Sequence, residues 1–138
     1  MREIRFRAWD NISKKMLLDG TINERTDFKL AIACNGGLIG YKDDLLSEST
    51  IERIADEEYD IMQFTGLHDK NGKEIYEGDI VIIHWKHSFL KCVITWNEKD
   101  ASFGTYWNGR NQSIHRRRQT PTTLEVIGNI YENPELIK

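Results

Sequence analysis

Turn-forming residues recur at short intervals through the second half of the chain, and this spacing constrains the fold more than any other feature. Asn71-Gly72, between two apolar segments, is the strongest short-range signal for a β-hairpin. Gly78 lies between two further apolar segments. A phosphate-binding loop would need glycines directly before a helix, and a P-loop would need Ser or Thr after Gly72-Lys73, where the chain has Glu74. Both glycines are therefore interpreted as turns between strands.

The segments between the turns have the residue patterns of β-strands. Residues 4–10 and 90–96 alternate, which predicts strands with one buried face. Residues 79–85, DIVIIHW, contain an unbroken apolar run, so both faces of that strand should be covered. Gly128 lies in a later strand where a bulky side chain would not fit, and residues 133–136, NPEL, predict a closing turn of helix. Strands this closely spaced predict a small barrel or a sandwich.

The N-terminal part of the chain breaks the β rhythm once. Ser49 and Glu52 form a capping-box pattern, and apolar residues then recur at helical spacing. We therefore predict one short helix over about residues 50–57. The whole chain is predicted to be mainly β, with an N-terminal β region and this helix in residues 1–58 and a C-terminal small barrel in residues 59–138.

The composition sets broad limits on function. The 138 residues include 19 basic and 22 acidic side chains, a net charge of −3, so the chain as a whole is not a basic nucleic-acid binder, although a local basic surface is compatible with it. The first residues have no apolar signal-peptide core, and no apolar run approaches the roughly 20 residues that cross a membrane. The two cysteines form no CxxC motif. We expect no membrane partner and a cytoplasmic location with reduced thiols.

The segment QFTGLHDKNGKEIYEGDIV, residues 63–81, resembles the signature of the YopX family of phage and prophage proteins. The resemblance continues in residues 4–10 and 125–136. It implies a phage setting in a bacterial host and an SH3-like barrel in the C-terminal part, and it implies no activity for any residue. We assign structural roles to the following signature residues: Thr65, Gly66, Asn71, Gly72, Tyr76, Gly78 and Asp79.

Three of these roles are specific. Thr65-Gly66 is predicted to form an abrupt chain reversal. Tyr76 is predicted to pack its ring and to place its hydroxyl on a backbone group. Asp79 is predicted to accept hydrogen bonds from nearby turn N–H groups.

The sharpest charge feature is the basic segment 115–118. Arg116, Arg117 and Arg118 are adjacent, and Trp107 lies on the preceding predicted strand. Arginines beside exposed aromatic rings can hold phosphates and stack bases. The alternative is a solvated loop or edge strand whose charge prevents aggregation.

Other residues could be considered for catalysis or metal binding. His84 and His87 lie near Cys92, but strand positions three apart point to opposite faces, and no fourth ligand is evident. Cys34 has no identifiable base and is better interpreted as a buried thiol. We therefore predict no metal site, no cofactor and no catalytic residue.

The tryptophans suggest self-association. One small barrel cannot enclose Trp9, Trp85, Trp96 and Trp107 together, so some pack against the N-terminal strands or form a subunit contact. We predict a non-enzymatic phage or prophage accessory protein that acts by binding or self-assembly as a homo-oligomer. The alternative is a nucleic-acid-binding module that uses residues 115–118.

Overall fold

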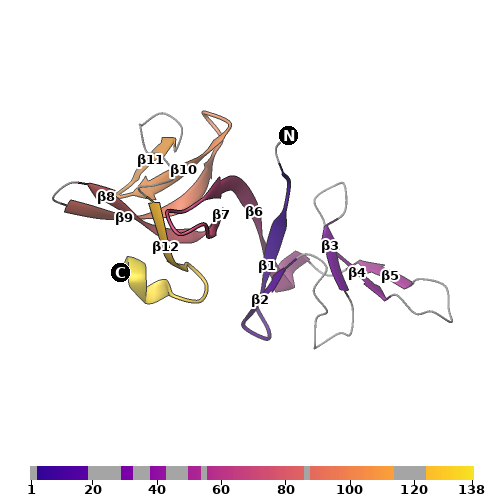
Figure 1. The fold of residues 1–138 in the computed structure, drawn as a ribbon. Coiled ribbons are helices and arrows are strands. Elements are labelled where there is room, and N and C mark those ends of the chain that lie inside the picture. The colour runs from indigo at the N-terminus through magenta and orange to yellow at the C-terminus, as the bar shows by residue number, and fades with distance from the viewer. Residues whose placement is uncertain are drawn as a thin grey trace. The chain divides into compact units, whose positions relative to one another are not determined.

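The protein is mainly β, as the sequence predicts, with strands over most of the chain that the computed structural model describes (Figure 1). Two compact units divide it: the N-terminal unit, Arg5–Met62, and the barrel unit, Met1–Ile4 with Gln63–Lys138. The division falls inside one strand, β6 (Tyr59–His68), rather than beside it. The structure describes residues 3–18, 29–32, 38–42, 50–53, 56–85, 88–113 and 124–138.

The barrel unit contains a curled, antiparallel five-stranded sheet of the SH3-like type (Figure 1). Its strands follow the order β11-β10-β9-β8-β12, so the last strand returns to pair with β8. The short β7 pairs with the second half of β6. The strand bounds are β7 (Glu74–Tyr76), β8 (Asp79–Trp85), β9 (Ser88–Asn97), β10 (Ser102–Trp107), β11 (Arg110–Ser113) and β12 (Leu124–Asn129).

The core of the barrel unit follows the alternation seen in the sequence. Cys92 and Ile94 of β9 point inward with Val81 and Ile83 of β8. Ile80 is also fully buried, so both faces of β8 are covered, as its unbroken apolar run predicts. Fully burying each of these side chains stabilises the fold by about 1.5–3 kcal/mol before conformational entropy is subtracted.

Two predicted turns in the barrel unit are confirmed. Gly72 and Gly78 have φ angles of +82° and +78°, and each lies between two consecutive strands. An L-residue with a Cβ is strained at such angles, which explains glycine at both positions.

Two predictions near the C-terminus are also confirmed. A short 3-10 helix, η3 (Pro134–Ile137), begins after Asn133 and has the proline in its first turn. Gly128 is packed too closely for a side chain, because an added Cβ would lie 2.5 Å from Oδ1 of Asn133.

The N-terminal unit contains two small sheets. One is the part β2-β1-β6 of a four-stranded sheet with the order β2-β1-β6-β7, and the other has the order β3-β4-β5. Ala8, Leu17 and Tyr59 form the buried core of this unit. The strand bounds are β1 (Phe6–Asp10), β2 (Lys15–Leu18), β3 (Lys29–Ile32), β4 (Leu38–Lys42) and β5 (Thr50–Arg53).

The predicted helix over residues 50–57 is wrong in its position. Thr50–Arg53 form β5, which pairs antiparallel with β4. The only helical turn in this stretch of the described chain is η1 (Asp56–Glu58), a single turn of 3-10 helix. An isolated helix of this length is marginal in water, and pairing with a neighbouring strand outweighs the local capping signal.

The tryptophans occupy different environments. Trp9 is buried in the N-terminal unit, whereas Trp96 and Trp107 of the barrel unit are 41% and 49% exposed. The side chain of Trp85 lies outside the described residues. Across the described segments, no helix has the length and apolar character needed to span a membrane.

Candidate functional site

The segment that resembles the YopX signature, residues 63–81, begins with a bulge in β6. Phe64 pairs with Tyr76 and His68 pairs with Glu74, so β6 advances four residues while β7 advances two. The predicted chain reversal at Thr65-Gly66 is therefore wrong, because the strand continues and only bulges there. Bulges occur frequently beside binding and catalytic sites, where they redirect side chains.

Hydrogen bonds hold the bulge in one conformation. The Thr65 hydroxyl donates to the carbonyl oxygen of Ile75 at 2.8 Å and accepts from the Leu67 N–H at 3.2 Å. Gly66 has a φ of +85°, and the space around its missing Cβ is open. The bulge therefore leaves a gap in the strand surface that a side chain would otherwise fill.

The hairpin after the bulge is organised by the carboxylate of Asp69. Its Oδ1 accepts from Asn71 N at 2.7 Å and Lys73 N at 2.9 Å, and its Oδ2 accepts from Val126 N at 3.0 Å. Burial by itself raises the pKa of Asp69, but the N–H donors of Val126, Lys73 and Asn71 outweigh burial and hold that pKa below its ordinary value. Asp69 therefore stabilises the turn and ties it to β12.

The predictions for Tyr76 and Asp79 have different outcomes. The Tyr76 hydroxyl donates to Glu74 Oε2 at 2.8 Å, so its partner is a carboxylate and not the predicted backbone group. Side chains two apart on a strand share a face, which brings Glu74 within reach. Asp79 Oδ2 accepts from Tyr76 N at 2.8 Å, as predicted.

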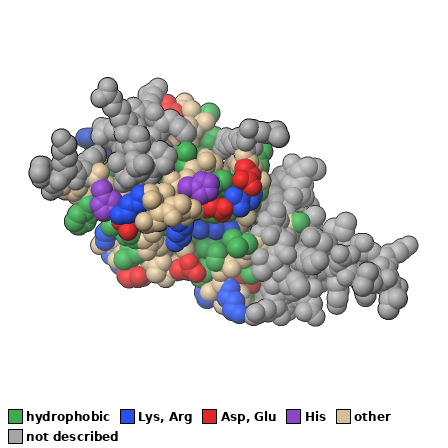
Figure 2. Space-filling view, viewed as in Figure 1, with side chains coloured by type: hydrophobic (Ala, Val, Ile, Leu, Met, Phe, Trp, Pro, Cys, Tyr) green, Lys and Arg blue, Asp and Glu red, His purple; other side chains and the backbone are tan. Residues whose placement is uncertain are grey.

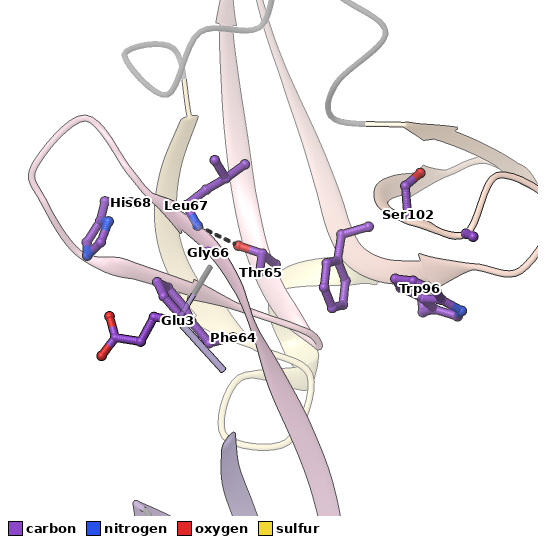
Figure 3. Close-up of a pocket in the computed structure, with 10 residues that line it drawn as sticks. Glu3, Phe64, Thr65, Gly66, Leu67, His68, Trp96 and Ser102 are labelled. Carbon is purple, nitrogen blue, oxygen red and sulfur yellow. Dashed lines mark hydrogen bonds between the residues drawn. The ribbon is translucent and has the colours of Figure 1, made fainter. Parts of the chain in front are cut away.

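An open pocket of about 540 Å³ lies beside the bulge, and we call it the bulge pocket (Figure 3). Residues 64–68 of β6 form its centre, and Trp96 and Phe103 come from β9 and β10. Glu3 lines it from the N-terminal segment of the same unit. In the view of Figure 3, Glu3 and His68 lie at one end and Trp96 at the other, with Gly66 between them.

Two accessible rings of the bulge pocket are each held by a buried phenylalanine. The Trp96 ring meets Phe103 edge to face, with centroids 5.1 Å apart and planes at 73°. The His68 ring meets Phe64 in the same way, at 5.6 Å and 74°. Such contacts are worth about 0.5–1.5 kcal/mol beyond apolar burial, and they restrict the orientation of both exposed rings.

A second, smaller pocket of about 360 Å³ contains the predicted binding residue Trp107. Tyr106 and Trp107 line it from the end of β10, and Lys91 lines it from β9. The C-terminal residues 136–138 complete it, with Lys91 Nζ donating to the Leu136 carbonyl oxygen at 2.9 Å. Its walls thus combine aromatic rings with amino groups.

The other predicted binding residues are the three arginines of the basic segment. Arg116, Arg117 and Arg118 fall outside the described residues. On the face in view in Figure 2, cationic, anionic and histidine side chains are interspersed rather than gathered by sign. The described surface in that view therefore has no large patch of one charge.

His84, one of the residues considered for metal binding, lies beside a carboxylate. His84 Nε2 lies 2.7 Å from Glu125 Oε2, and the same oxygen lies 2.7 Å from Lys70 Nζ. The hydrogen bonds from Lys70 and then His84 hold the pKa of Glu125 below its usual value. His87 and Cys34 are outside the described residues, and among those described no three His, Cys, Asp or Glu side chains gather as metal ligands.

Sequence reasoning missed the bulge pocket and three of its residues, Glu3, His68 and Trp96, as a group. A glycine inside a strand pattern, as at Gly66, is a recognised sign of a bulge and was the available signal. The contribution of Glu3 has no local signal, since it reaches the pocket only through the fold.

Comparisons with known proteins identify relatives of the chain. The family model described as "YopX protein" matches residues 5–138. The crystal structure of protein EF1440 from Enterococcus faecalis is similar over 100% of both chains, with 29% identity and a TM-score of 0.59. The structure of yopX from Bacillus subtilis is 22% identical, covers 100% of this chain and 98% of its own, and has a TM-score of 0.63, which shows a shared fold. No curated protein matches the chain.

Proposed function

Because this chain belongs to the YopX family, we propose that it is a non-enzymatic accessory protein of a phage or prophage that binds copies of itself. It works as a homo-oligomer in the cytoplasm of a bacterial host. The proposal follows from the phage setting that the family resemblance implies and from the exposed apolar surface around Trp107.

The observation that carries self-association is a cluster of exposed apolar side chains, which we call the Trp107 surface. Tyr106, Trp107 and Ile137 are 47%, 49% and 48% exposed, and all three line the smaller pocket. Large rings that are presented by a rigid sheet lose little side-chain entropy on binding, and they are enriched at protein interfaces. A second copy of the chain would bury this surface.

Light scattering tests the proposal. The wild-type chain should have a mass above that of a monomer, and Trp107→Ser with Tyr106→Ser should shift it towards the monomer, because each interface ring contributes about 2 kcal/mol or more. Ile12→Ser, an exposed apolar change in the N-terminal unit, is the control and should leave the mass unchanged. A wild-type monomer at high protein concentration rejects the proposal.

The second candidate function is nucleic-acid binding at the same surface. Tyr106 and Trp107 could stack bases while Lys91 and Lys138, which line the same pocket, contact phosphates. The basic segment 115–118 would add further phosphate contacts. This candidate is favoured over self-association only if binding depends strongly on salt.

Fluorescence anisotropy with labelled single-stranded and double-stranded DNA separates the two functions. Replacing Arg116, Arg117 and Arg118 with Ala should weaken binding and flatten its dependence on salt between roughly 50 and 200 mM. Replacing the same number of lysines elsewhere, namely Lys15, Lys73 and Lys99, matches the change in charge and should have a smaller effect. Binding that is absent, or insensitive to salt, removes this candidate.

A further inference from the structure

The structure places the Asn-Gly steps of the barrel unit, Asn71-Gly72 and Asn108-Gly109, in turns of different kinds. An asparagine that precedes glycine can lose its side-chain amide without an enzyme. The glycine nitrogen attacks Cγ of the asparagine, the Cγ–Nδ2 bond breaks, and ammonia leaves with the proton of the glycine N–H. Water then opens the five-membered succinimide ring and leaves aspartate or isoaspartate. The conformation of the turn decides how readily the glycine nitrogen reaches Cγ.

The Asn108-Gly109 turn can reach the geometry that this attack needs. Pairing of Trp107 with Arg110 closes it as a two-residue loop, and its φ angles of +48° and +76° are those of a type I′ turn. Rotating the peptide unit between Asn108 and Gly109 gives a type II′ turn, which closes the same hairpin and changes the sign of φ only at the glycine. The first residue of a type II′ turn has a ψ near about −120°. At that angle the next backbone nitrogen eclipses Cβ of an L-residue, so the Gly109 nitrogen comes within reach of the Asn108 side chain.

The same turn is open to solvent. Asn108 and Gly109 are both exposed, and the space around the missing Cβ of Gly109 is empty. Among the described residues the Gly109 N–H has no hydrogen-bond partner. Its proton can therefore pass to a base in solution, and water can reach the succinimide ring.

The Asn71-Gly72 turn is held in place by contrast. The Gly72 N–H donates to the carbonyl oxygen of Asp69 at 3.0 Å, so the nitrogen that would attack is already engaged. The Asp69 carboxylate also accepts from the N–H groups of Asn71 and Lys73, at 2.7 and 2.9 Å. Rotating the Asn71-Gly72 peptide unit would break the first of these bonds and disturb the others. The reaction at Asn71 therefore has an added barrier that Asn108 lacks.

We propose that Asn108 is a site of spontaneous deamidation in the folded protein and that Asn71 is protected from it. The product carries a carboxylate in the pocket that Lys91 and Lys138 also line. Isoaspartate also adds one carbon atom to the backbone of the turn. Deamidation therefore changes both the charge beside Trp107 and the spacing of its hairpin. The reaction needs no partner, so the proposal does not depend on self-association.

Mass spectrometry of protease fragments tests the proposal on the wild-type chain, kept folded at mildly alkaline pH so that the N–H groups lose their protons more readily. Asn108 should convert at least about fivefold faster than Asn71, as expected from the one hydrogen bond that must break. The same chain in urea should convert both at similar rates. Asn35-Gly36 lies outside the described residues and is mapped on its own fragment. The proposal is wrong if Asn108 converts no faster than Asn71 in the folded chain, or if urea leaves their ratio unchanged.

Variants then test whether the turn sets the rate. Asp69→Ala removes the carboxylate that holds the Asn71 turn, so conversion of Asn71 should rise about fivefold while that of Asn108 stays constant. Asp69→Asn keeps one acceptor oxygen and should give a smaller rise in a more stable protein. Asp100→Ala removes a carboxylate from another exposed turn and should change neither rate. If neither Asp69 variant accelerates Asn71 while amide spectra show that it is folded, the turn does not protect this residue and the proposal is overturned.

Discussion

Asp69 is predicted to be the most important single side chain of the family-like signature for stability. It is 5% exposed, and its carboxylate accepts three backbone hydrogen bonds. Two come from the hairpin turn that follows β6, and the third comes from Val126 in β12. Asp69→Ala removes both acceptor oxygens and all three bonds, which loosens the turn and leaves it a weaker connection to β12, through the Lys70 N–H bond to the Leu124 carbonyl oxygen.

The expected loss of stability depends on whether water can reach each N–H group that loses its acceptor. Asn71 and Lys73 are exposed, so water replaces the lost acceptor and each bond costs about 0.5–1 kcal/mol. The Val126 N–H is only partly accessible, and leaving such a donor without a partner costs about 1–3 kcal/mol. The free energy of unfolding should therefore fall by about 3 kcal/mol. Asp69→Asn keeps one carbonyl oxygen and should cost about half of that amount.

Urea denaturation followed by tryptophan fluorescence measures this change. Asp100→Ala is the control, because Asp100 lies in an exposed turn and accepts a side-chain hydrogen bond from Asn97 at 3.0 Å. Its effect should stay within about 0.5 kcal/mol. If Asp69→Ala costs less than about 1 kcal/mol, the carboxylate does not organise the hairpin as argued.

The pH dependence gives a second readout of the same carboxylate. The folded-state pKa of Asp69 lies below its ordinary value of 3.8, so folding favours the ionised form. Its contribution is fully present above the unfolded-state pKa and is lost as the pH falls through the folded-state pKa. The stability difference between wild type and Asp69→Asn should be constant above about pH 5 and should shrink below about pH 4. A difference that grows on acidification contradicts the assignment.

Two further predictions concern Cys92 and Gly128 of the barrel unit. Burial raises the pKa of the Cys92 thiol to about 11, against the weaker opposing effect of the Thr105 hydrogen bond, so Cys92 should react with a thiol reagent at about pH 8 only on unfolding; rapid labelling of Cys92 in the folded state would contradict this. Gly128→Ala places a Cβ 2.5 Å from Asn133 Oδ1 and should cost about 1–3 kcal/mol in urea denaturation, part of which Asn133→Ala should restore in the double variant; additive losses would show that the strain arises elsewhere.

The sequence predicted the parts of the fold that depend on local chemistry. The backbone is left-handed at Gly72 and Gly78, and glycine adopts this conformation without strain because it has no Cβ. The unbroken apolar run of β8 predicted that both faces of the strand are buried, as they are. The strand β5 was missed because its pairing with β4 is a contact between separate segments, and a capping-box pattern records only local preference.

The bulge pocket depends on contacts that a linear reading cannot supply. The extra residues of β6 become a bulge only against the register of β7, and Trp96 reaches the pocket through the separate pairing of β9 with β10. Thr65 and Gly66 do not form the predicted chain reversal, but they fix the bulge, because one hydroxyl bonds both sides of it and one glycine allows it. The Thr65 hydroxyl and Gly66 also shape the space between His68 and Trp96. A structural role for this signature is therefore no argument against a binding role, since the bulge that completes the strand pairing is also what shapes the pocket.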